Sequence, residues 1–381
     1  MMSLAIKMLI GNRASCIGVI FGIFLATLLI SQQSAIFLGL VSRSYRLVTD
    51  IPSPNIWVID PATESDVKVR GLPEGYLDVV RSISNIEWAV PINIMDIPLV
   101  TQSGIFDLGQ LIGIDDSTMI GAPPEILEGN LRDLHREGGV LVDVYSAKGS
   151  LAHILSDGTK VPLTVGDSLE INNHRAIVVG ICKITQGFYP QPNIFTTNHN
   201  FKNFSSRNTI DFIAAKTKTG ANVEEVLQKI NAFSVLEGLT RNQLEWRMTK
   251  SFLKTGILIN FGLSVALGII IGFSIAGLIF YIMTLENIKY YALIKAIGGS
   301  QDQITKMIAV QVTIVGVIGY LLGTGATILW GFATEDTSLA FLFPWQLFVF
   351  TSVIVLLICI FTAALSIHKV ARTDPILLMG A

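Results

Sequence analysis

The segment ILINFGLSVALGIIIGFSIAGLIFYIMTL, residues 257–285, contains no Asp, Glu, Lys or Arg. A helix needs roughly 20 apolar residues to cross a bilayer core about 30 Å thick, and this segment is longer than that. Residues 307–334 and 338–367 form two further charge-free segments above that length. A fourth, residues 14–30, reaches it if the helix continues through residues 31–40. The sequence therefore predicts four transmembrane helices.

The composition of the whole chain supports this prediction. Hydrophobic residues make up 51% of the 381 residues and charged residues only 15%, and the mean hydropathy is +0.57. Soluble domains carry about 25% charged residues. The net charge of −2 provides no basic stripe that could neutralise phosphates, so we expect no nucleic acid as a partner.

The first apolar segment follows Lys7 and Arg13, as the apolar core of a secretory signal peptide would. It is long for such a core of about 7–15 residues, and no clear A-x-A cleavage site follows it. We interpret it as an uncleaved first helix.

The distribution of basic residues predicts the orientation, because short loops rich in Lys and Arg lie in the cytoplasm. Such residues precede the first helix, separate the second from the third and follow the fourth. The loop between the third and fourth helices carries only Glu335 and Asp336. We therefore expect both termini in the cytoplasm and residues 41–252 on the opposite side. The basic residues are Lys7, Arg13, Lys289, Lys295, Lys306, Lys369 and Arg372.

The large segment between the first two helices is predicted to be an α+β domain, because strands and helices alternate in it without a repeating order. Residues 168–180 are typical of a hairpin that turns at Asn172-Asn173, since Asn tolerates positive φ. The remaining predictions are strands at 55–60, 209–217 and 140–144, the last leading into a helix, an amphipathic helix at 73–83 and a further helix at 222–233.

These predictions divide the chain into nine parts. They are a cytoplasmic N-terminal segment (1–13), transmembrane helix 1 (14–40), the α+β domain (41–252), transmembrane helix 2 (253–285), a cytoplasmic segment (286–305), transmembrane helix 3 (306–331), a short outer loop (332–341), transmembrane helix 4 (342–367) and a cytoplasmic tail (368–381).

No pattern of catalytic residues is present. The triplet Gly158-Thr159-Lys160 lacks the first glycine and the Lys-Ser/Thr order of a phosphate-binding loop. The five histidines show no metal-ligand spacing, and no nucleophile elbow occurs. Cys16 and Cys359 lie in apolar segments, which leaves Cys182 alone in the polar region. We expect no catalytic residue, metal or cofactor in this chain.

The predicted transmembrane helices contain several glycines in their charge-free segments. Ionisable residues inside a bilayer usually mark an ion or proton pathway, and their absence disfavours an ion channel or a proton-coupled carrier. Gly268 and Gly272 form a small-xxx-small pair, which lets two helices approach closely. They belong either to packing within the chain or to a dimer interface.

The loop between the second and third helices, ENIKYYALIKAIGGSQDQ at residues 286–303, predicts a short amphipathic helix. Ile288, Tyr291, Ala292 and Lys295 share one face, and the glycines at 298–299 supply a stop with available positive φ. Ser300 is then suited to cap the third transmembrane helix. With only two lysines the short helix is poor at lipid adsorption, so we expect it to dock on a partner.

This loop resembles that of the FtsX/MacB-type permeases of ABC transporters. The family pattern A-L-x-[RK]-A-[LI]-G-[AG]-[ST]-x-x-x-I follows a Glu, and here residues 292–304 follow Glu286. Fragments at 111–115, 165–171, 178–180 and 369–375 are also similar. The chain length and the stretch 33–40 most resemble the DevC-like exporters. The departure is Asn287 and Tyr290-Tyr291, where family loops are more basic.

The resemblance implies a non-catalytic permease of the bacterial inner membrane that dimerises, as a homodimer rather than a heterodimer, and works with a separate ABC ATPase holding ATP and Mg. The ATPase would drive export or extraction of an amphipathic cargo (lipid, glycolipid, lipoprotein, peptide or drug) by mechanotransmission. A periplasmic adaptor and an outer-membrane duct could take part. The alternative is a signalling scaffold that activates an extracytoplasmic hydrolase or sensor.

The resemblance also yields a hypothesis about the residues that contact the ATPase. Glu286 and Lys289 would be polar contacts, and Gly298 would shape the turn. The hypothetical ATPase-docking residues are Glu286, Lys289, Tyr291, Lys295, Gly298 and Gly299.

Overall fold

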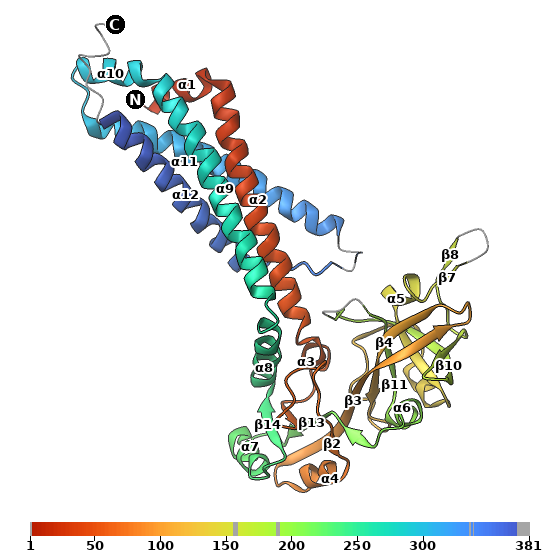
Figure 1. The fold of residues 1–381 in the computed structure, drawn as a ribbon. Coiled ribbons are helices and arrows are strands. Elements are labelled where there is room, and N and C mark those ends of the chain that lie inside the picture. The colour runs from red at the N-terminus through yellow and green to blue at the C-terminus, as the bar shows by residue number, and fades with distance from the viewer. Residues whose placement is uncertain (1, 155–158, 188–190, 335–336, 338, 372–381) are drawn as a thin grey trace. The chain divides into compact units, whose positions relative to one another are not determined.

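The computed structural model describes residues 2–371 except 155–158, 188–190, 335–336 and 338 (Figure 1). Contacts within the chain define two compact units. We call Met1–Leu40 with Gly256–Ala381 the helical unit, and Val41–Thr255 the inserted domain. This confirms a large domain inserted between the first and second long helices. Glu335, Asp336 and the predicted tail beyond residue 371 lie outside the described residues.

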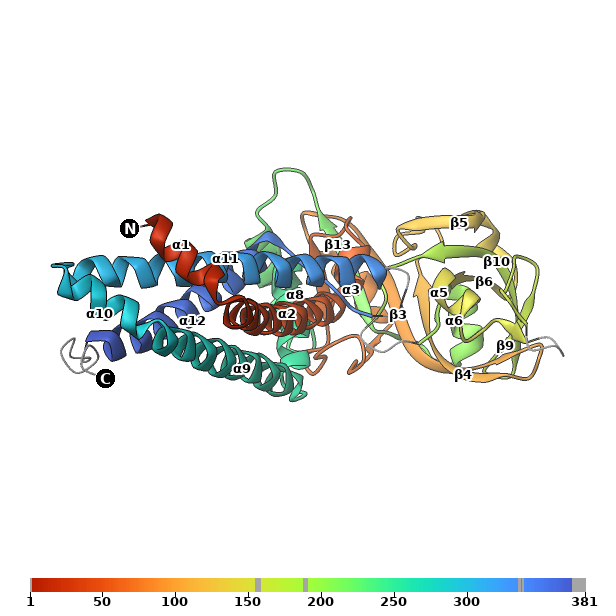
Figure 2. The same cartoon turned by 90° about the horizontal axis from the view of Figure 1, so that it is seen from above.

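The helical unit contains, among the described residues, four helices long and apolar enough to cross a membrane. They are α2 (Arg13–Arg43), α9 (Ile257–Glu286), α11 (Gln301–Ala333) and α12 (Trp345–Ala371). Two short helices, α1 (Met2–Gly11) and α10 (Ile288–Ala296), lie at one end of this bundle in both views (Figures 1 and 2).

The observed ends of these helices differ from the sequence-based ends by a few residues. Helix α9 begins at Ile257, where the predicted span begins at residue 253. The reason is Gly256, whose φ of +80° separates α9 from the preceding helix. Helix α11 already begins at Gln301, because Ser300 caps it there.

Two glycines of α9 pack against α2 of the same chain. A Cβ added to Gly272 would collide with the Cβ of Ala26, and one added to Gly268 would lie 3.0 Å from Cγ1 of Ile30. Small residues thus allow the two backbones to approach closely, as the small-xxx-small spacing predicts.

Helix α2 packs equally closely against α11. A Cβ on Gly323 would lie 2.6 Å from the Cβ of Thr27. One turn further along, the hydroxyls of Ser31 and Thr327 share a hydrogen bond of 2.6 Å, and both residues are fully buried. Helix α2 is therefore held by α9 through shape and by α11 through shape and one polar contact.

The inserted domain is built on a sheet whose strands run in the order β14-β1-β13-β3-β4-β11-β6-β10-β5, with β9 pairing with β10 and β3. Strand β3 (Ile86–Thr101) joins its two halves. The first part of β3 pairs with β13 (Phe212–Thr217), and the second part pairs with β4 (Phe106–Ile114) and β9 (Ser168–Ile171).

The other elements of this domain complete the α+β architecture (Figure 1). They are the strands β1 (Ile56–Ile59), β2 (Leu72–Pro73), β5 (Glu125–Gly129), β6 (Gly139–Asp143), β7 (His153–Ile154), β8 (Lys160–Val161), β10 (His174–Lys183), β11 (Asn193–Thr197), β12 (Thr209–Ile210) and β14 (Glu237–Thr240), the helices α3 (Arg46–Asp50), α4 (Gly75–Ser82), α5 (Val144–Lys148), α6 (Asn198–Ser205), α7 (Val223–Asn231) and α8 (Arg241–Leu253), and a 3-10 helix (Leu131–His135).

The predicted elements of the domain are confirmed. The hairpin of β9 and β10 turns at Asn172 and Asn173, whose φ angles are +48° and +63°. The strand expected at 209–217 is divided by Asp211 into β12 and β13. Asp211 is buried and accepts the backbone N–H of Ile94 at 2.9 Å, so it belongs to the interior although it is charged.

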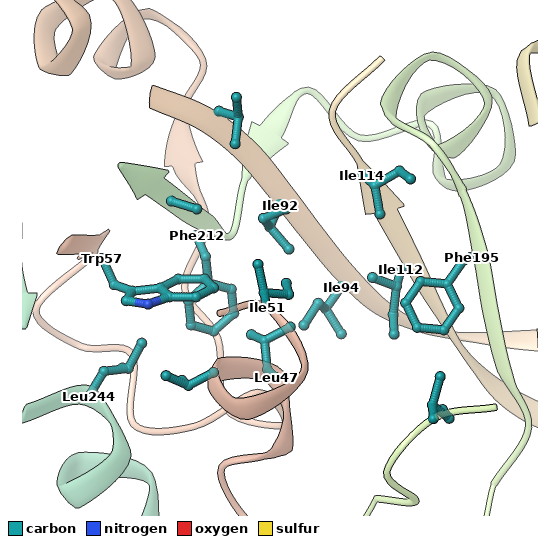
Figure 3. Packing of buried hydrophobic residues seen from close by; sticks show 14 of the residues in the cluster. Leu47, Ile51, Trp57, Ile92, Ile94, Ile112, Ile114, Phe195, Phe212 and Leu244 are labelled. Carbon is teal, nitrogen blue, oxygen red and sulfur yellow. The ribbon is translucent and has the colours of Figure 1, made fainter. Parts of the chain in front are cut away.

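The core of the domain packs around Trp57 of β1, which is fully buried against the edge of Phe212 with ring centroids 6.3 Å apart (Figure 3). Leu47 and Ile51, at α3, pack in the same cluster. Helix α3 therefore anchors the start of the domain on the face of the sheet that carries Trp57 and Phe212.

A buried arginine on α3 supplements this apolar contact. Arg46 is 5% exposed. Its guanidinium donates to the side-chain oxygens of Gln110 on β4 and Asn193 on β11, and to the carbonyl of Thr185 at 3.2 Å. Burial lowers the pKa of this guanidinium. Among the described residues it forms no ion pair within 4 Å, but more distant carboxylates, Asp66 first, favour its charged form.

Candidate docking site at the α10 end of the helical unit

The turn after α10 has the geometry that the sequence predicts. Gly298 has a φ of +92°, which only glycine adopts without strain. The N–H of Gly299 donates to the carbonyl of Ile294 at 2.8 Å. Ser300 and Gln303 then form a reciprocal capping box at the start of α11. The short helix, its glycine stop and the serine cap are therefore confirmed.

The inner face of α10 is fixed by a buried hydrogen-bonded bridge. The hydroxyl of Tyr291 donates to Oε1 of Gln311 on α11 at 3.1 Å, and Nε2 of Gln311 donates to the carbonyl of Ala5 on α1 at 2.9 Å. Both side chains are at most 1% exposed. Burial raises the pKa of Tyr291 to about 12, so at neutral pH the phenol keeps the proton that it donates.

Gln311 was not among the residues selected from the sequence. Its signal is an amide in an otherwise apolar helix, where polar side chains serve as hydrogen-bonded links between helices. Tyr291, which the sequence analysis proposed as a docking residue, is buried and holds α10 against α11 through its hydrogen bond to Gln311.

Two other hypothetical docking residues also make contacts within the chain. Glu286, the last residue of α9, accepts hydrogen bonds from the side chains of Asn12 and Ser15 at the start of α2. Nζ of Lys295 donates to the carbonyl of Val370 in α12 at 3.1 Å. These contacts and the Gln311 bridge tie this end of the helical unit together.

The outer face of α10 is apolar and exposed. Lys289 is exposed there, with Tyr290 at 59%, Leu293 at 49% and Ile297 at 78% exposed. Gly298 is exposed at the turn, and Gly299 is half-buried. The spacing of residues 290, 293 and 297 is that of one helical face, a signal that the sequence carried. Such a face on a rigid helix is suited to contact with another protein.

A groove of about 820 Å³ opens between α10 and α1. The start of α2 also contributes to its wall. The apolar, aromatic and basic residues of its wall include Leu4, Lys7, Arg13, Tyr290, Leu293 and Ile297.

No metal centre is found in the part of the chain that the structure describes. It contains no group of three or more His, Cys, Asp and Glu side chains that could hold an ion. Cys182 is buried, and burial raises the pKa of its thiol far above the ordinary value, which makes it a poor nucleophile.

Two family models match the chain and together cover most of it. The model for the MacB-like periplasmic core domain matches residues 15–233, more than half of the chain, and the model for the FtsX-like permease C-terminal region matches residues 262–375. No curated protein matches the sequence.

Solved structures that match about half of this chain include two extracytoplasmic regions. The periplasmic region of MacB from Actinobacillus actinomycetemcomitans is 13% identical, with a TM-score of 0.39, and the match covers 52% of this chain and 94% of that one. The extracellular domain of the noncanonic ABC-type transporter YknZ from Gram-positive bacteria is 11% identical, with a TM-score of 0.36, and the match covers 49% of this chain and 100% of that one.

Four apolar helices, an α+β domain between the first two, and the family-model matches define an ABC transporter permease. The chain belongs to the FtsX/MacB-type family of these permeases. Members of this family are generally non-catalytic membrane components that work with ABC ATPase partners. The particular likeness to DevC-like exporters stays a prediction.

Proposed function

We propose that this chain is the membrane subunit of an exporter or extractor of an amphipathic cargo, in which a separate ATPase docks on the outer face of α10. The observation that carries the proposal is the contrast between the two faces of α10. The inner face is locked by Tyr291 and Gln311, while the outer face exposes Lys289 and apolar side chains. A rigid helix with an exposed face transmits a push from a partner without deforming.

The long helices suit this mechanotransmission. Helix α2 runs unbroken from Arg13 to Arg43, where the chain enters the inserted domain, and α9 ends at Glu286, next to α10. ATP and Mg would be held by the ATPase on the cytoplasmic side, with both termini of the permease on that side. A homodimer of this chain would bring two α10 helices to two ATPase subunits.

The test is co-purification of the tagged chain from its native membrane in mild detergent, with bound proteins identified and ATP hydrolysis measured. Lys289→Glu places a negative charge on the outer face and is expected to reduce ATPase recovery about tenfold. Lys306→Glu is the matched control, because Lys306 is an exposed lysine on α11, outside α10, and it should keep recovery near the unmodified level.

Full recovery of the ATPase with folded Lys289→Glu protein would contradict docking on this face. If an ATPase binds normally but no amphipathic compound stimulates its hydrolysis, the cargo part of the proposal fails and a signalling role gains support.

A further inference from the structure

The groove between α1 and α10 combines two kinds of surface. Lys7 and Arg13 bring two positive charges to its wall, and no acidic residue is among the described residues that line it. Both side chains belong to exposed residues, and neither takes part in an ion pair within the described ranges. The groove wall therefore carries positive charge, and the carboxylate of Glu286 beside it accepts hydrogen bonds from Asn12 and Ser15.

The rest of the wall is largely apolar. Leu4 and Met8 of α1 face the groove from one side, and Leu293 and Ile297 of α10 from the other. Its volume of about 820 Å³ lies within the range of about 300–1,000 Å³ that is usual for small-molecule sites. A ligand that fits both surfaces carries a negative charge and an apolar part.

The groove lies where such a ligand is abundant. Arg13 is the first residue of α2, and the charge-free part of that helix begins at Ala14. Basic residues that flank the apolar core of a membrane span lie at the level of the lipid headgroups. Lys7 belongs to the short helix α1, which ends at Gly11 just before this point. Tyr290 also lines the groove, and aromatic side chains with one polar end are enriched at this level.

We propose that this groove binds an anionic phospholipid of the adjoining leaflet. Lys7 and Arg13 hold the phosphate, as basic pockets between membrane helices do, and the apolar wall takes the first methylenes of the acyl chains. The bound lipid bridges α1 and α10 on the open side of the groove, while Gln311 bridges the same two helices inside the protein. The lipid therefore restrains α10 on the side that faces the groove, opposite the side held by Gln311.

This site overlaps the proposed ATPase contact at Tyr290, Leu293 and Ile297, whereas Lys289 is not part of the groove wall. The proposal concerns the permease alone and does not depend on the proposed function. A test without the ATPase therefore distinguishes the failure of one from the failure of the other.

The experiment is native mass spectrometry of the full-length chain in detergent, titrated with phosphatidylglycerol or with phosphatidylcholine of the same acyl chains. We expect bound phosphatidylglycerol at concentrations where phosphatidylcholine does not bind. The double variant Lys7→Gln/Arg13→Gln should weaken phosphatidylglycerol binding roughly thirtyfold, since each basic residue near an anionic lipid strengthens its binding several-fold. Lys306→Gln is the control, with an expected change below about twofold.

A photoactivatable phosphatidylglycerol gives a second readout, which should label peptides of α1 and α10. Equal binding of the two lipids, unchanged binding by the double variant, or an equal loss in Lys306→Gln would each overturn the proposal. So would complete displacement of the lipid by millimolar inorganic phosphate, because the site would then recognise a free anion and not a phospholipid.

Discussion

The helical unit and the inserted domain satisfy most of their buried polar side chains in different ways. In the inserted domain, polar side chains bind partners far away in sequence: Arg46 binds Gln110 and Asn193. In the helical unit, buried hydroxyls mostly bind the carbonyl one turn earlier in their own helix, as Thr27 does with Ile23 at 2.8 Å and Thr351 with Leu347 at 2.9 Å.

This difference in hydrogen-bond partners follows from the surroundings of each unit, which are water for the inserted domain and the bilayer for the helical unit. In water, the unfolded chain solvates every polar group, so a folded domain must bring partners together from different strands. In a bilayer, backbone groups must be satisfied within the helix itself, and hydroxyls join the same local pattern. Association of helices then depends on close approach, which explains why glycines stand at the contacts of α2.

The largest expected effect comes from breaking the polar network of the inserted domain. Arg46→Leu leaves the side-chain oxygens of Gln110 and Asn193 buried without this donor, and we expect a loss of about 3 kcal/mol in the free energy of unfolding. The readout is the labelling rate of the buried thiol of Cys182 in increasing denaturant, in a full-length chain whose two other cysteines are replaced.

The control for this variant is Arg175→Leu on β10, since Arg175 is exposed and should change stability by less than about 0.5 kcal/mol. An equal effect of the two substitutions would mean that the buried network contributes nothing beyond the loss of an arginine.

The next effect tests close approach in the helical unit. Gly272→Ile forces a side chain into Ala26 of α2, and overpacking of this kind costs about 1–3 kcal/mol. Thermal unfolding of the chain in detergent measures it. Gly262→Ile, in the same helix but with no neighbouring atom within 4 Å, controls for the change in helix propensity. Similar melting of both variants would show that α9 and α2 do not need to touch.

The smallest expected effect concerns the hydrogen bond between Ser31 of α2 and Thr327 of α11. A double-mutant cycle with Ser31→Ala and Thr327→Ala should give a coupling of about 0.6 kcal/mol, since interhelical hydrogen bonds in membranes are weak. Reversible unfolding in mixed detergent micelles is the measurement. A coupling above about 2 kcal/mol would place this contact with the buried networks of the inserted domain and remove the distinction between the units.

Much of the structure could be predicted because its signals are local. Charge-free segments predict the long helices, and Asn172-Asn173 and Gly298 mark turns whose backbone angles depend on a few adjacent residues. The inner and outer faces of α10 were harder to assign. Helical spacing places Tyr290 and Tyr291 on different faces. Which face is buried depends on packing between helices, and it is Tyr291 that bonds to Gln311, twenty residues later in the chain.

The partners of Arg46 could not be predicted, because they belong to strands that follow it by many residues. The order of the strands was equally hidden. It depends on β3 pairing with different strands along its length, and pairing of that kind leaves no periodic trace in the sequence.

The pairing of β1 has a consequence for biosynthesis. Its neighbours in the sheet are β13 and β14, with Val58 opposite Ile213 and Ile56 opposite Thr240. At about 5–20 residues per second, a ribosome needs roughly 10–40 s to make the chain between these partners. Throughout that interval a strand of consecutive apolar residues, Ile56–Ile59, has both edges open. The nascent domain therefore exposes a binding segment for chaperones long before its sheet is complete.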